Sequence, residues 1–204
     1  MKKLLLLLGF GLFIAGPSAA QRDYPRVEIF GGYSYLHTDL LFKSNIPKGW
    51  SASFTGNVHR IIGIEADFSG HYGRQPLGRF APGLSTRYRT HLFLFGPKFA
   101  ARLPRVTPWG HALFGASQLS VEGRNFQGDY SDSRTAFTWA AGGGLDVHVR
   151  KHLALRVIQA DYIRAKSSAF PMTTGQTGTY YVIGGGSSNN LRLSFGMVLT
   201  WGGG

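Results

Sequence analysis

Apolar and polar residues alternate along most of this chain with a period of two, the spacing of a β-strand that has one apolar face. The segment 134–166 shows the pattern well. Its first half places Phe137 and Leu145 on one face and Asp146 on the other. A short basic turn at 148–152 separates the two halves, so the segment predicts an antiparallel hairpin.

The second half of this hairpin contains an irregularity. Leu153 and Leu155 share the apolar face, but Asp161 would join them there if the alternation continued unbroken. One extra residue near Val157 and Ile158, a β-bulge, restores the pattern and turns Asp161 to the polar face.

Similar alternation elsewhere predicts eight strands in all. They span residues 26–36, 49–58, 62–72, 87–102, 109–121, 134–147, 153–166 and 190–201. Short turns alternate with long loops between them. The turns are 59–60, 103–108 and 148–152, and the loops are 37–48, 73–86, 122–133 and 167–189.

The two middle strands show the least regular alternation. In the fourth strand we expect Leu92 and Leu94 on the apolar outer face and Arg89 on the inner face, with Pro97 marking a bulge or a strand end. In the fifth strand we expect Leu113 on the outer face as well.

These features predict an all-β fold, a closed antiparallel up-and-down eight-stranded transmembrane β-barrel. Each strand is close to the roughly 9–11 residues that cross a bilayer when tilted. The odd number of connections places both termini at the short-turn end. A soluble lipocalin-like barrel also has about eight strands. Its apolar face points inward, however, and its outer face is rich in Lys and Glu.

The N-terminus has the features of an exported protein. Residues 1–20 combine Lys2 and Lys3, an apolar run and a small-residue cleavage site, which predicts a signal peptide cleaved after Ala20 and a barrel domain at 21–204. Without the two lysines, the mature chain has twenty basic and ten acidic side chains. Export argues against a nucleic-acid partner, and we expect the basic loops to lie beside lipopolysaccharide phosphates.

Two sets of side chains form the candidate functional residues. The expected charge network of the lumen is Glu28, Glu65, Asp67, Arg89, Asp146, Arg156, Asp161 and Arg192. The expected interfacial aromatic residues are Tyr33, Tyr35, Trp50, Tyr72, Trp109 and Trp201. Arg156 and Arg192 are expected to pair with acids such as Glu28, Glu65 or Asp161. Paired charges in so narrow a lumen would form a plug.

Other candidate chemistry is weak. His148 and His152 have a zinc-like spacing, but they lie in a turn and lack a third ligand, so we expect no metal. Asp67, Ser69, His71 and His91 could lie near one rim, as in a hydrolase, but ordinary inward polar residues explain them better. No motif predicts a cofactor.

Several segments resemble a known family. A signal peptide, VEIFGGYSYLH in the first strand, AAGGGLDVHVRKHLALRVIQADYI in the sixth and seventh, and LRLSFGMVLTW in the last resemble small bacterial outer-membrane β-barrels, such as the transmembrane domain of outer-membrane protein A and the opacity-type surface proteins. Such barrels usually end on an aromatic residue, whereas here Gly202–Gly204 follow Trp201. The peptidoglycan-binding domain of longer relatives is not expected.

The resemblance implies an outer-membrane barrel with a polar, largely plugged lumen. We therefore expect a non-enzymatic structural or interaction protein that presents four surface loops (37–48, 73–86, 122–133 and 167–189) to an extracellular ligand. Its surroundings would be outer-membrane lipid and lipopolysaccharide. A narrow porin-like channel for small solutes is the first alternative, and an envelope lipid hydrolase is the second.

Overall fold

The fold is taken from a computed structural model, which describes residues 24–38, 44–76, 85–125, 128–167, 170–174, 179–183 and 186–202. The predicted signal peptide lies outside the described residues, as do Gly203 and Gly204. Within these ranges, no helix is long and apolar enough to cross a membrane.

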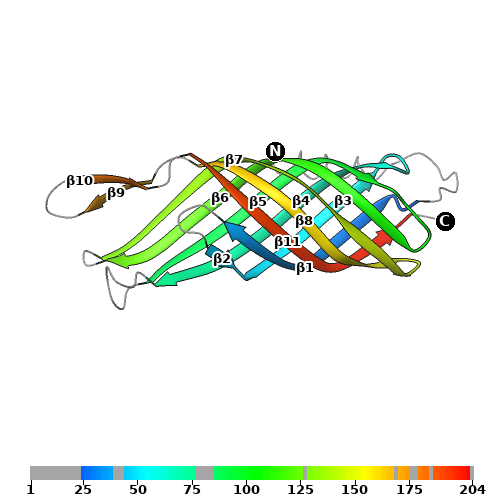
Figure 1. The fold of residues 1–204 in the computed structure, drawn as a ribbon, viewed down its shortest axis with the longest axis horizontal. Helices are drawn as coiled ribbons and strands as arrows, with labels where there is room; N and C mark the ends of the chain where they lie inside the picture. Colours follow the sequence, from blue (N-terminus) through cyan, green and yellow to red (C-terminus); the bar gives the residue numbers. More distant parts are fainter. Residues whose placement is uncertain are drawn as a thin grey trace, which may run out of the picture.

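Eight long antiparallel strands form a closed barrel (Figure 1), which confirms the predicted fold class. They are β1 (Val27–Thr38), β3 (Lys48–Asn57), β4 (Ile62–Pro76), β5 (Ser85–Ala100), β6 (Val106–Asn125), β7 (Gly128–Arg150), β8 (Leu153–Ser167) and β11 (Gly186–Trp201). Each pairs with the next along the chain, and β11 closes the barrel on β1 from Val27 opposite Trp201 to Thr38 opposite Asn190. No long strand has a free edge, as lipid requires.

The strands are strongly staggered around the barrel. One circuit of the barrel shows this: it starts at Glu28 of β1 and moves from each residue to its paired residue on the next strand. The circuit reaches Asn190 on β11 and returns to β1 at Thr38, ten residues beyond Glu28. Such a stagger tilts the strands, and a barrel of eight tilted strands has an interior that side chains can fill.

The short turns and the described chain ends lie together at one end of the barrel, here called the turn end. The turns lie at 58–61, 101–105 and 151–152. The backbone N–H of Arg26 donates to the carbonyl of Trp201 at 2.8 Å, joining the two chain ends. In Figure 1 the turn end is on the right, where blue β1 begins and red β11 ends. The described chain ends, Tyr24 and Gly202, thus lie at the end where the sequence predicted both termini.

The opposite end, here called the loop end, contains more strand than the sequence predicted. Part of the expected loop 37–48 is β2 (Ser44–Ile46), which pairs with β1 and is separated from β3 by Pro47. The expected loop 122–133 is the paired continuation of β6 and β7, apart from residues 126–127 outside the description. The extension of β6 and β7 exceeds the length that a bilayer crossing needs, so backbone pairing can form it without apolar alternation.

The expected loop 167–189 also contains strands. β9 (Phe170–Thr174) and β10 (Thr179–Ile183) form a separate two-stranded hairpin. Figure 1 shows it at the far left, projecting from the loop end. Of the expected loop 73–86, residues 77–84 lie outside the described part of the chain.

The outer face of the barrel is a continuous apolar band. Large exposed apolar side chains occur on all eight strands, among them Ile29, Phe54, Phe68, Phe95, Phe114, Phe137, Leu155 and Phe195. An exposed apolar surface of this extent suits lipid rather than water.

The predicted facing of the two middle strands is wrong. Leu92 and Leu94 point inward and are 2% exposed, whereas Phe95 on the opposite face is 60% exposed. Leu113 on β6 is likewise fully buried. Pro97 ends no strand and creates no bulge, because the pairing of β5 with β6 keeps one register on both sides of it. Its side chain faces outward.

The predicted bulge in β8 is confirmed. Val157 and Ile158 are both exposed, and the register shifts there against both neighbouring strands. As a result, Arg156 before the bulge and Asp161 after it both face the lumen.

Candidate functional site

The candidate functional site is the lumen, which side chains from opposite walls cross at several levels. At the turn end, Glu28 of β1 accepts hydrogen bonds from Lys98 of β5 at 2.9 Å, Arg102 at 2.5 Å and Asn57 at 2.9 Å. Lys98 is 2% exposed, so its ammonium needs this carboxylate. Asn57 lies on the neighbouring strand β3, whereas Lys98 lies on β5 and Arg102 in the turn after it, across the lumen from β1.

A second group is centred on Arg156 of β8. Its guanidinium donates two hydrogen bonds to Asp146, at 2.9 and 3.2 Å, and a third to Gln159 at 2.8 Å. The guanidinium carbon also lies 4.1 Å from the ring centre of Phe30 and 4.2 Å from that of Trp109. Bidentate pairing and cation–π contact together satisfy a charge that is almost completely buried.

A third group links His111, Arg192 and three acids. His111 lies 2.7 Å from Glu65 and 2.9 Å from Asp161, one ring nitrogen to each. Arg192 donates to Asp161 at 2.9 Å and to Asp67 at 2.7 Å. Because β4, β6, β8 and β11 contribute these side chains, the group spans the width of the lumen.

The ionic groups balance one another. The buried acids are Glu28, Glu65, Asp67, Asp146 and Asp161, and the cations that face them are Lys98, Arg102, Arg156, Arg192 and His111. Ionised carboxylates only accept hydrogen bonds, so both ring nitrogens of His111 must donate, which makes the ring a cation. Five acids thus face five cations within the described part of the lumen.

An apolar cluster lies on the loop side of this network, although we expected a polar lumen throughout. Its buried members are Leu36, Ile46, Leu92, Leu94, Leu113, Ala140 and Ile163. On each strand they lie nearer the loop end than the charged residue of the same strand, as Leu113 does beyond His111. Ions entering from the loop end would meet this cluster first.

Glycines of β7 make room for the network. A Cβ on Gly142 would lie 2.1 Å from the Asp161 carboxylate, and one on Gly144 would lie 2.6 Å from the Trp109 ring. Gly142 and Gly144 therefore allow close packing inside the barrel.

Seven of the eight expected lumen charges lie in the lumen, and Arg89 does not. Arg89 is exposed on the outer face near the loop end and pairs there with Glu122. Its misplacement follows from the inverted facing of β5. Arg192 contacts Asp161, as expected, and also Asp67, but its contacts do not include Glu28 or Glu65.

Five of the six expected interfacial aromatic residues lie on the outer face. These are Tyr33, Tyr35, Trp50, Tyr72 and Trp201. Trp109 instead points into the lumen, is 6% exposed and contacts Lys98 and Arg156. The inverted facing of β6 explains this correction too. The role of the other five at the membrane boundary remains a prediction.

The alternative sites do not assemble. His148 contacts Thr107 and His152 contacts the Thr200 carbonyl, and the described residues contain no metal-binding group of three His, Cys, Asp or Glu. Asp67 and Ser69 both bind Arg192. His71 contacts Ser34 at 2.9 Å, and His91 lies on the outer side near Tyr72. The expected hydrolase set is therefore divided between unrelated contacts.

Sequence reasoning missed several members of the network. Lys98, Arg102 and His111 lie on or beside the two strands whose facing was inverted. The aromatic parity of Phe93, Phe95 and Phe99 was the available signal, because it places Lys98 on the opposite, inner face.

Solved structures with the same architecture are outer-membrane and bacterial surface proteins. The attachment invasion locus protein Ail of Yersinia pestis, solved in complex with the heparin analogue sucrose octasulfate, matches 84% of this chain and 97% of its own, with a TM-score of 0.53 and 16% identity. Neisserial surface protein A matches 86% of this chain and 97% of its own (TM-score 0.52, 14% identity). The outer membrane protein AlkL matches 91% and 94% (TM-score 0.51, 12% identity).

At these identities the likeness concerns the fold. The expected resemblance to small outer-membrane β-barrels is confirmed at that level. No family model and no curated protein matches the chain.

Proposed function

We propose that this protein is a non-enzymatic outer-membrane β-barrel that presents its loop-end strands and connections to ligands outside the cell, while its lumen stays plugged. The observation that carries the proposal is the crossing of the lumen by ion pairs between strands that are not neighbours, above all Arg192 of β11 to Asp67 of β4. The same guanidinium also pairs with Asp161 on the neighbouring strand β8.

A channel would have to open this network. Separating a buried ion pair leaves each charge without compensation, at a cost on the order of 3–5 kcal/mol when one partner is lost. Several such pairs lie in series with the apolar cluster of Leu36, Leu94 and Leu113. We therefore favour a closed barrel over the narrow channel.

Conductance in planar bilayers tests the proposal. The purified mature chain should show no stable, steady pore, whereas a wide porin inserted under the same conditions should. A large and steady conductance from the unmutated protein would make the channel the better function, with the same charges as its selectivity lining. Unchanged acyl chains of lipid A after expression of the protein would argue against the hydrolase.

Exposed basic side chains at the loop end favour contact with anionic groups of the membrane surface. Arg74, Arg87, Arg89, Arg164 and Lys166 are exposed beyond the apolar band. Lipopolysaccharide carries phosphates at this level, and Arg binds phosphate with paired hydrogen bonds. The sulfated ligand of the Ail complex supports the further idea that loop-end ligands of this protein are anionic.

Location in the outer membrane follows from the same proposal. Residues 1–20 would be a cleaved signal peptide and residues 21–204 the barrel domain. N-terminal sequencing of protein from the outer-membrane fraction should begin at Gln21.

A further inference from the structure

A basic pocket occupies the mouth of the barrel at the turn end. Its volume is about 470 Å³, and its lining comes from the start of the barrel domain and all three short turns. The lining residues are Pro25, Arg60, Arg102, Leu103, Pro104, His148, Val149, Arg150 and Lys151.

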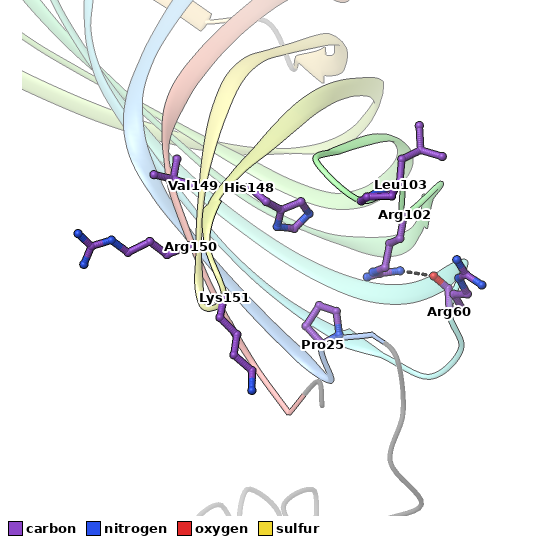
Figure 2. Close-up of a pocket in the computed structure, with 9 residues that line it drawn as sticks. Pro25, Arg60, Arg102, Leu103, His148, Val149, Arg150 and Lys151 are labelled. Atoms are coloured by element: carbon purple, nitrogen blue, oxygen red, sulfur yellow. Dashed lines mark hydrogen bonds between the residues drawn. The ribbon is translucent and has the colours of Figure 1, made fainter.

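Arg102 forms the fixed part of this pocket. Its guanidinium donates to Glu28 and to the backbone carbonyl of Arg60, and its side chain is 9% exposed. Figure 2 shows Arg102 and His148 facing each other across the mouth, with Pro25 below them in this view. A positioned guanidinium at the floor of an open pocket is already oriented for an anion.

The remaining charge of the lining has one sign. Arg60 and Lys151 lie on opposite sides of the mouth, and no lining residue is acidic. Both side chains are exposed. A multiply charged anion in the pocket would be attracted by both, with no acidic side chain in the lining to oppose it.

We propose that this pocket binds a phosphate ester on a small organic body, from the compartment that the turn end faces. A phosphate ester can carry two charges and three acceptor oxygens, more than a single carboxylate offers to Arg60, Arg102 and Lys151. Pro25, Leu103, Pro104 and Val149 add an apolar wall. The volume also exceeds what inorganic phosphate alone would fill, and lies within the range of small-molecule sites.

Calorimetric titration of the mature chain in detergent micelles tests the site, with glucose 6-phosphate as the probe and glucose as the uncharged comparison. Glucose 6-phosphate should bind with an affinity that falls as salt rises, and glucose should not bind. Combined Arg60→Gln and Lys151→Gln substitutions should weaken binding by about tenfold or more, because each removes a charge-assisted hydrogen bond. Both side chains lie at the surface and leave the Glu28 network intact.

Arg105→Gln is the matched control. It removes the same charge at the same end of the barrel, and Arg105 is exposed in the turn 101–105 but does not line the pocket. Binding should weaken less than about threefold. If Arg105→Gln weakens binding as much as the double variant, the effect is general attraction and the proposed site is wrong.

A second arm identifies the source of the phosphate. In nanodiscs with and without phosphatidic acid, a lipid phosphomonoester, amide NMR shifts of residues 101–105 and 148–151 report occupancy of the pocket. Shifts caused by phosphatidic acid but not by glucose 6-phosphate would assign the site to a lipid headgroup, whereas the reverse would assign it to a soluble ester. If neither probe shifts these amides at millimolar concentration, the proposal is overturned.

Discussion

Arg192 shows how single residues hold this lumen together. Its side chain is completely buried, yet its guanidinium has two carboxylates and a hydroxyl as partners. Asp161 keeps other partners in His111 and Gln159, whereas Asp67 has no other ion-pair partner among the described residues. Loss of Arg192 therefore affects Asp67 most.

Replacing Arg192 by Leu should lower the free energy of unfolding by about 3–5 kcal/mol, because Asp67 is left as a buried uncompensated charge. Urea unfolding in micelles, followed by tryptophan fluorescence, measures the loss. Adding Asp67→Asn should recover part of it. Adding Glu28→Gln should not, since Glu28 pairs with Lys98 and Arg102 instead. Recovery by Glu28→Gln and not by Asp67→Asn would contradict the pairing.

At the scale of the element, the bulge of β8 decides which residues can serve the lumen. Arg156 and Gln159 both face inward because two residues, Val157 and Ile158, lie outward between them. The bulge thus adds one residue to an otherwise regular strand. Deleting that one residue would leave Arg156, Gln159 and Asp161 facing inward.

Deletion of Ile158 should therefore preserve the barrel, whereas deletion of Ala160 should disrupt it. Without Ala160, either Asp161 or Gln159 must turn toward lipid, at a cost on the order of 2 kcal/mol or more. For each variant, an unheated sample that migrates faster on an electrophoresis gel than the boiled sample indicates a closed barrel. Equal loss of the folded band in the two variants would show that the bulge itself, and not the facing, is required.

At the scale of the whole molecule, the barrel has an apolar outside and two unlike ends. The turn end has tight basic turns, while the loop end extends β6 and β7 far beyond the length needed to cross a bilayer. Figure 1 shows this asymmetry, with the short turns on the right and the long hairpins on the left. We expect the outward-facing aromatic residues to lie at the two boundaries between them.

Variants that each retain one tryptophan should report this arrangement in bilayers with lipids brominated at different depths. Trp50 should be quenched near the loop-end boundary and Trp201 near the turn-end boundary. Trp109 should be quenched least at every depth, because it lies in the lumen between Lys98 and Arg156. Strong quenching of Trp109 at the bilayer centre would contradict the inward facing of β6.

The architecture could be predicted from the sequence because it depends on local periodicity. A strand in a membrane barrel needs alternating facing along its own length, so β1, β3, β7 and β11 were visible in the chain itself. The bulge was visible for the same reason, since Asp161 would otherwise share a face with Leu155.

Tertiary structure decided what periodicity leaves open. Alternation divides β5 and β6 into two faces, but it does not say which face is inside when both are apolar. In the folded barrel, the face that carries Leu92, Leu94 and Leu113 is the inner one, because these side chains pack in the apolar cluster of the lumen. Partner choice was equally non-local, because the stagger of the closed barrel, and not proximity in sequence, brought Arg192 to Asp67 and Glu28 to Lys98. The extended hairpins form by backbone pairing in water, which needs no apolar face and so leaves no periodic trace in the sequence.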